Sequence, residues 1–378
     1  MLQVLREFKV GRPQVYAGLM LLAFMAQCLW TADTRKLSDL EYRYIASGLT
    51  SAGEKTLNAS PFTGVVAAFP VRFTYVARKI ATPRLSAALA VPRPWLLRLP
   101  FAIFGVWLGA ALWWVARRLF DDDGGYVALA LYCTSPAMVI ISSNIGPEIL
   151  LAWSSLGLIY TAIGVSHTLY APRKKWIPRI IILGLSIGFA LATAWWSFTL
   201  VLLAFAYMMY LAPGCRRKAL TVLASASLVG CAVWTVIYWF TGSFGLGVRP
   251  LLAQKPTLES LANLTFALSG HTDGYVLVFL FIAALTAYGS WPRARYFGNT
   301  APLITGLAAV LLFSLVPAVH IWNATLGLSF VFIFVGGLAA DFLETRLRRP
   351  IALLLAACFV LRAVLTVMAL IIWVRNPV

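Results

Sequence analysis

The chain has 378 residues, of which 61% are hydrophobic and only 12% charged, and its formal net charge is +18. Soluble domains carry about 25% charged residues, so this composition excludes an ordinary soluble globular protein. A basic excess can indicate nucleic-acid binding, but basic residues between apolar spans set the orientation of a membrane protein instead. We therefore expect a lipid bilayer as a partner, and no nucleic acid.

Apolar runs dominate the chain. A helix that spans a bilayer needs about 20 largely apolar residues. The runs predict an all-α polytopic membrane protein with about 11 transmembrane helices in a single membrane domain, 1–378. In chain order they are Val15 to Trp30, Pro100 to Ala116, Gly125 to Ser142, Glu148 to Tyr170, Ile180 to Ala194, Phe198 to Ala212, Ala219 to Phe240, Tyr275 to Trp291, Ala301 to Val319, Ala324 to Ala340 and Pro350 to Val374.

The basic residues give an orientation. With a cytoplasmic N-terminus, 17 of the 31 Lys and Arg residues fall on inside segments, as the positive-inside rule requires. The same rule divides residues 180–212 into two helices, because one long helix would place a basic cluster outside. The prediction is therefore N-terminus in and C-terminus out. Arg362 interrupts the last run and should face the bundle or snorkel to the surface.

Two long outside loops follow, at 31–99 and 241–274. Within the first, residues 37–48 carry a pattern typical of a short amphipathic helix along the membrane surface, with Gly48 as its stop. Ser38 and Glu41 also have the spacing of a capping box, and Asp39 suits the first helical turn. These acids therefore have a structural interpretation beside a functional one.

Glu148 opens the fourth run, directly after the turn 143–147. Its structural interpretation is an acid at a helix N-terminus, with Pro147 in the first helical position. Its functional interpretation rests on the membrane, where ionisable groups at the ends of apolar spans are candidates for function. The topology places Glu148 on the same side as Asp39 and Glu41.

Residues 39–46, DLEYRYIA, resemble the first-loop acidic motif of the C-type (GT-C) membrane glycosyltransferases. The resemblance is greatest to the protein O-mannosyltransferases (glycosyltransferase family 39) and the aminoarabinose transferases. It continues through LRLPFAIFG at 97–105, RRLF at 117–120, TSP at 134–136 and GPEILL at 146–151, and it covers about residues 30–212.

The resemblance implies that a sugar moves from a polyprenyl-phosphate donor to a lipid, glycan or protein acceptor outside the membrane. It also implies amphipathic juxtamembrane helices in the first loop. Such transfer needs a general base near the acceptor hydroxyl, for which Asp39 or Glu41 is the candidate, with Glu148 as a second acid. Asp39 and Glu148 are the candidate ligands if a divalent metal takes part. An apolar groove would hold the lipid tail.

Further residues are expected to bind the substrates. Basic groups must meet the leaving phosphate, and the motif itself supplies a cation and an aromatic ring. The candidates are Arg43, Tyr44, Lys55, Arg98, Arg249, His271 and His320.

The chain departs from the family pattern at two acidic places. Leu40 stands where the first acid of a commonly adjacent pair is expected, and Gly146 stands where relatives often carry an acid before the proline. Two alternatives follow: a non-catalytic scaffold or accessory subunit of envelope glycan assembly, and a lipid or sugar transporter. The expected location is a bacterial plasma (inner) membrane, with the site facing outward.

Overall fold

The computed structural model describes residues 12–49, 60–81, 93–170, 176–194, 197–241, 274–290, 297–315, 325–346 and 348–375. Within these ranges the backbone forms helices joined by turns and contains no strand. The predicted all-α class is confirmed. In chain order the helices are α2 (Arg12–Thr34), α3 (Asp39–Leu49), α4 (Pro61–Ala81), α5 (Pro94–Cys133), α6 (Pro136–Ser142), α7 (Pro147–Thr168), α8 (Ile177–Thr193), α9 (Phe198–Leu211), the 3₁₀ turn η3 (Pro213–Cys215), α10 (Arg216–Thr241), α12 (Gly274–Ser290), α13 (Phe297–Leu315), α14 (Thr325–Leu343) and α15 (Arg348–Arg375).

The lengths of these helices agree with a membrane bundle. Among the described residues, six helices are long and apolar enough to cross a bilayer, and four shorter apolar helices accompany them. The expected break within residues 180–212 is confirmed, because α8 ends at Thr193 and α9 begins at Phe198. The count of eleven spans and the orientation stay predictions.

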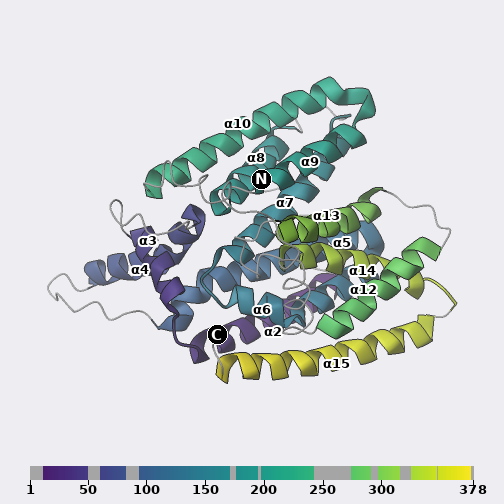
Figure 1. The fold of residues 1–378 in the computed structure, drawn as a ribbon, viewed down its shortest axis with the longest axis horizontal. Coiled ribbons are helices and arrows are strands. Elements are labelled where there is room, and N and C mark those ends of the chain that lie inside the picture. Colours follow the sequence, from purple (N-terminus) through teal and green to yellow (C-terminus); the bar gives the residue numbers. More distant parts are fainter. Residues whose placement is uncertain are drawn as a thin grey trace.

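The bundle has a buried centre and two apolar edges. Figure 1 shows α10 and α15 along opposite edges, with α5, α7 and α14 between them. Helix α14 is buried along most of its length, whereas α15 exposes apolar side chains such as Leu353, Val360 and Ile372. An apolar helix exposed in this way suits a lipid environment. Arg362 of α15 is buried against the Phe332 ring, 5.3 Å from Cζ to the ring centroid, so it faces the bundle.

Two predicted spans meet within α5. Phe120 and Asp121 leave the helical conformation, and Asp121 has a φ of 61°, a conformation uncommon for residues other than glycine. The kink separates the runs 100–116 and 125–142. The second run is itself broken at Thr134 and Ser135, before Pro136 starts α6, because proline cannot donate the backbone bond that a continuous helix needs.

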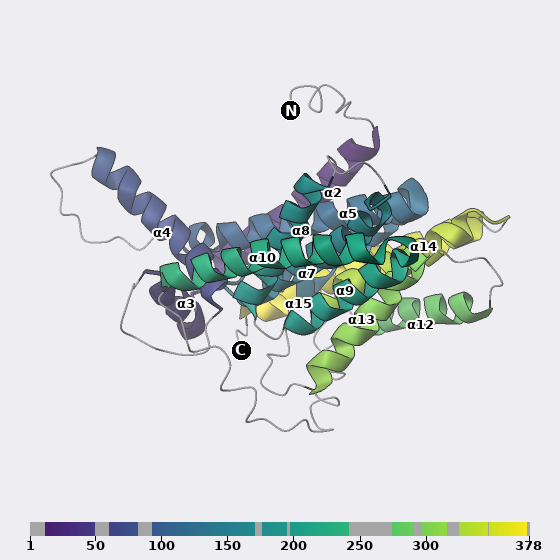
Figure 2. The ribbon, with the colours of Figure 1, turned by 90° about the horizontal axis from the view of Figure 1, so that it is seen from above.

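Helices α3 and α4 form one end of the molecule, and α4 projects outward from the bundle in Figure 2. Helix α3 confirms the helix predicted at 37–48. The resemblance implied further juxtamembrane helices in the first loop, but no bounds were predicted for α4. The two helices cross at Gly48 and Gly64, where a side chain on Gly48 would overlap the backbone of Gly64. Gly48 therefore permits close packing, and α3 continues past it to Leu49. We call this part of the molecule the α3 end.

Candidate functional site at the α3 end

Arg98 is the centre of a buried polar network. Its side chain is fully buried near the start of α5, and all five of its N–H groups donate hydrogen bonds. Nε donates to Oε1 of Glu41 at 2.8 Å, and one N–H of Nη2 donates to Oε2 at 2.7 Å. The other three donate to the carbonyls of Ala32, Arg35 and Lys36, at 2.7 to 2.9 Å. These carbonyls lie where α2 ends and lacks internal partners.

Glu41 is saturated in the same way. Besides Arg98, its carboxylate accepts from the backbone N–H of Ser38 at 2.8 Å and from that of Ile145 at 3.0 Å. The Ser38 hydroxyl accepts in return from the Glu41 N–H at 3.3 Å, so the capping box is confirmed. Burial opposes ionisation of Glu41, but Arg98 and the two backbone donors outweigh it and lower the pKa of this carboxyl.

These contacts define the roles that the two side chains can fill. A general base needs a lone pair within reach of the proton it removes, and Glu41 has its oxygens occupied and is 3% exposed. Arg98 likewise has no N–H left for a phosphate. We call Arg98, Glu41 and the backbone groups they bind the Arg98 node. Its geometry suits joining α2, α3, α5 and the 143–147 turn, rather than contact with a substrate.

Glu148 stands in a different environment on the adjoining turn. Gly146 is extended, with φ −159° and ψ 165°, and Pro147 takes the first position of α7. The partly buried Glu148 side chain folds back beside Gly146, so that a methyl group added there would overlap its carboxylate. The carboxylate accepts from its own backbone N–H. Unlike Glu41, it forms no ion pair with another described residue.

The remaining motif residues lie on α3. Tyr44 is partly buried. Burial raises the pKa of its hydroxyl, and the nearby Glu148 carboxylate raises it further by a smaller amount. The structure therefore brings Tyr44 and Glu148 into one electrostatic neighbourhood. Asp39 and Arg43 are exposed. Leu40, at the place of a family acid, is 44% exposed.

Four predicted substrate-binding residues lie outside the described residues: Lys55, Arg249, His271 and His320. The predicted metal ligands Asp39 and Glu148 are both described. Within the described part of the chain, no three His, Cys, Asp or Glu side chains gather in a way that could hold a metal ion.

Sequence reasoning missed three residues at the α3 end, where Arg35 contacts both Asn144 and Trp373. Arg35 follows α2 directly and donates from Nη1 to the Asn144 side chain at 2.8 Å. Its Cζ lies 4.7 Å from the centroid of the Trp373 ring, near the end of α15. The only available signal was the position of Arg35 at the end of an apolar run.

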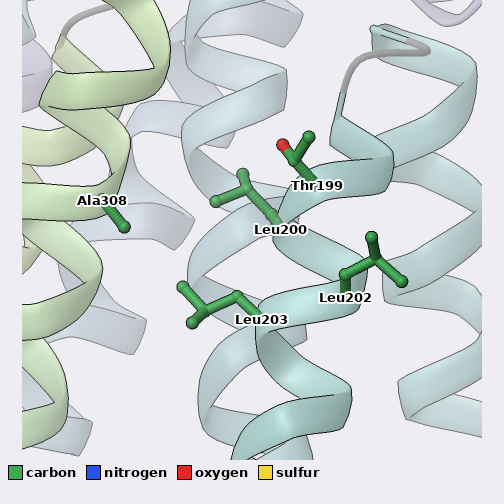
Figure 3. A pocket seen from close by; sticks show the side chains of 5 residues that line it. All are labelled: Thr199, Leu200, Leu202, Leu203 and Ala308. Carbon is green, nitrogen blue, oxygen red and sulfur yellow. The ribbon is translucent and has the colours of Figure 1, made fainter.

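An apolar groove opens between α9 and α13. It has a volume of about 400 Å³ and is lined by Thr199, Leu200, Leu202, Leu203 and Ala308. In Figure 3, Leu200 and Leu203 point across the groove toward Ala308. The groove has the chemistry expected for a lipid chain, because its walls are almost wholly aliphatic.

Comparison with known proteins supports the family resemblance. A family model described as dolichyl-phosphate-mannose-protein mannosyltransferase matches residues 81–239. This range contains Arg98 and Glu148 but not the motif on α3. No curated protein sequence matches the chain significantly.

Solved structures show the fold. ArnT from Cupriavidus metallidurans bound to undecaprenyl phosphate matches with a TM-score of 0.64 at 14% identity, over 91% of this chain and 64% of that one. Its apo state gives 0.63 at 14% identity, over 92% and 64%. The archaeal oligosaccharyltransferase AglB from Archaeoglobus fulgidus, in complex with an inhibitory peptide and a dolichol-phosphate, gives 0.53 at 14% identity, over 94% and 55%.

These matches confirm the predicted resemblance to the C-type membrane glycosyltransferases. The fold is ArnT-like, and the chain is an integral membrane protein with several apolar helices. The chain spans 64% of the length of the ArnT structure.

Proposed function

We propose that the chain is a glycosyltransferase that moves a sugar from a polyprenyl-phosphate donor to a hydroxyl acceptor on the outer side of a bacterial plasma membrane. The family model and the ArnT-like fold support the class of reaction. The structures of ArnT and AglB contain undecaprenyl phosphate and dolichol-phosphate, which supports a lipid-phosphate donor. The acceptor is a lipid, a glycan or a protein.

The position of Glu148 carries the proposal. Its carboxylate is partly buried at the α3 end, near Tyr44, and has oxygen lone pairs that no ion pair with a described residue occupies. In the proposed step this carboxylate takes the proton of the acceptor hydroxyl. The acceptor oxygen then bonds to the anomeric carbon, and the bond from that carbon to the phosphate oxygen breaks. Polyprenyl phosphate leaves with the electron pair.

The surrounding residues have supporting roles in this proposal. Glu41 and Arg98 hold α3 against the 143–147 turn and so position Glu148 and Tyr44. Asp39 and Arg43 are exposed to the solvent from which an acceptor arrives. The α9–α13 groove is the candidate site for the lipid tail.

Replacing Glu148 by Gln tests the proposal. The purified protein is reconstituted with undecaprenyl phosphate carrying a radiolabelled hexose or pentose, and with envelope extract as acceptor. We expect transfer to fall by about 10²- to 10⁴-fold, the usual contribution of general base catalysis. Asp33→Asn is the matched control, since Asp33 is an exposed acid near the end of α2. Undiminished transfer by Glu148→Gln would contradict the assignment.

A divalent metal held by Asp39 and Glu148 stays part of the proposal without a step assigned to it. Two carboxylates are enough for a metal such as Mg²⁺ when substrate phosphate and water complete the coordination. Dialysis against EDTA tests this point. Transfer that is lost and then restored by Mg²⁺ or Mn²⁺ supports the metal, and full transfer in metal-free buffer contradicts it.

One observation favours the scaffold alternative. Glu41 and Arg98, both in the resembling segments, have all their hydrogen-bonding capacity taken up by the protein itself. A chain that keeps such a network for its shape can retain the fold without the reaction. Co-purification with an active transferase, together with inactivity of the isolated chain on every donor, would support this alternative over the enzyme.

A further inference from the structure

Arg35 is a buried cation that the Arg98 node does not neutralise. Its side chain belongs to the short connection between α2 and α3, and the residue is 8% exposed. Nη1 donates to Asn144 and the guanidinium lies over the Trp373 ring. Nε is buried and has no hydrogen-bond partner among the described residues. The side chain is thus held on two sides and still has donors to offer.

The charges of the described residues around it do not balance. Glu41 and Arg98 form an ion pair, with 2.7 Å between Nη2 and Oε2, and cancel each other. Arg35 forms no ion pair with a described carboxylate and is the surplus charge among the described residues of the cluster. Burial lowers the pKa of Arg35, while Glu41 acts against this shift and Arg98 adds to it. A buried charge without a counterion is costly in a protein, and a Trp ring offsets only part of that cost.

The location indicates which anion would restore the balance. Arg35 directly follows Thr34, the last residue of a candidate membrane span, and Trp373 lies two residues before the end of another. Tryptophan and arginine at such positions lie at the level of lipid headgroups. A guanidinium is suited to phosphate because its planar N–H groups match two phosphate oxygens at once.

We propose that Arg35, fixed by Asn144 and Trp373, is a binding site for the phosphate group of a membrane lipid. The phosphate can belong to a polyprenyl phosphate or to a phospholipid headgroup, which share the chemistry that Arg35 recognises. If it is the polyprenyl phosphate, the site deepens the proposed function and rests on it. Binding itself does not require sugar transfer.

The test measures binding in dodecyl maltoside micelles, which contain no phosphate. Farnesyl phosphate, short-chain phosphatidylglycerol and inorganic phosphate are titrated separately, and the midpoint of thermal unfolding is recorded. A ligand that binds the folded state raises this midpoint with its concentration. We expect a lipid phosphate to raise it, and farnesol, which has the same tail without phosphate, to leave it unchanged.

Arg35→Gln should weaken the binding of the effective lipid at least tenfold. Lys36→Gln is the matched control, because it removes an adjacent but exposed cation, and it should bind like wild type. Should Arg35→Gln not fold, Arg35→Lys keeps the charge without the planar fork, and weaker binding is again expected. Equal binding by the Arg35 variant, or no response of wild type to any phosphate ligand, overturns the proposal.

The separate titrations also show which molecule carries the bound phosphate. A response confined to farnesyl phosphate identifies the isoprenoid carrier, and one confined to phosphatidylglycerol identifies a phospholipid. An equal response to inorganic phosphate shows that no lipid is needed and overturns the lipid site. Phosphate binding without any sugar transfer leaves this inference standing while the proposed function fails, so the two results are distinguishable.

Discussion

Two carboxylates at the same end of the bundle have opposite environments. Glu41 accepts four hydrogen bonds and sits in a buried ion pair with Arg98. Glu148, at the start of α7, is partly buried and folds back beside Gly146, with no ion pair to a described residue. A saturated carboxylate stabilises a structure, whereas one with lone pairs to spare can exchange a proton. The motif that resembles the family marks the first of these acids, yet the second is better placed for chemistry.

Removing one partner of the buried Glu41–Arg98 ion pair should have the largest effect on stability. Arg98→Met leaves a buried carboxylate without its cation and three carbonyls without donors. Breaking a buried pair in this way costs about 3–5 kcal/mol, so we expect the free energy of unfolding to fall by that amount in a mixed-micelle denaturation. Arg93→Met is the matched control, because Arg93 is exposed just before α5, and it should change little.

A double variant tests whether the two residues act as a unit. In Glu41→Leu/Arg98→Met neither charge remains to be buried alone. We therefore expect its loss of stability to be clearly smaller than the sum of the two single losses. Strictly additive losses would show that the pair contributes nothing beyond its separate contacts.

Gly146→Ala tests whether the position of the Glu148 carboxylate matters for sugar transfer. The extended backbone at Gly146 accepts alanine without strain, but the new methyl group overlaps the Glu148 carboxylate. We expect a folded protein whose displaced carboxylate transfers sugar about 10²-fold more slowly, since a shift of about 1 Å can cost that much. Gly164→Ala is the control on α7, the helix that follows Gly146, because nothing lies within 4 Å of the added methyl group. Wild-type transfer by Gly146→Ala would mean that this position of the carboxylate is not needed.

The difference between what the sequence predicted and what it missed follows from the range of the interactions. Apolar runs predict helices because the signal lies within each segment, and the capping box at Ser38 spans only three residues. The bond between Glu41 and Arg98 joins residues 57 apart in the chain, and no local pattern reveals it. Arg98 could therefore be identified as a basic group on the predicted outer side, but not as one whose donors are already used.

The bounds of helix α4 and the contacts of Arg35 were missed for related reasons. Helix α4 contains Pro70 and ends in a basic stretch, which locally resembles a loop more than an apolar span. Arg35 looks like an ordinary flanking cation at the end of a span. Its contact with Trp373 joins the connection after α2 to the last described helix, and such long-range contacts appear only once the chain is folded.

Lowering the pH should have the smallest effect, because it protonates Glu41 without removing a side chain. The pKa of Glu41 is lowered by its partners, so its carboxylate stabilises the folded state above the ordinary glutamate pKa of about 4.3. That stability is lost as the pH falls through the lower folded-state pKa, because protonation removes the charge that Arg98 and the two backbone donors bind. We expect the midpoint of thermal unfolding to decline between about pH 5 and pH 3.

A matched pair of variants assigns this decline to Glu41. Asp39→Asn removes an exposed acid from the same turn of α3 and should retain the decline. Glu41→Gln should start from a lower stability at neutral pH and vary less across the same range. This effect is smaller than that of Arg98→Met, because partial protonation weakens the node without removing a partner. An undiminished decline in Glu41→Gln would assign the acid sensitivity to other carboxyls. It would contradict the inference that the ionised Glu41 carboxylate stabilises the fold.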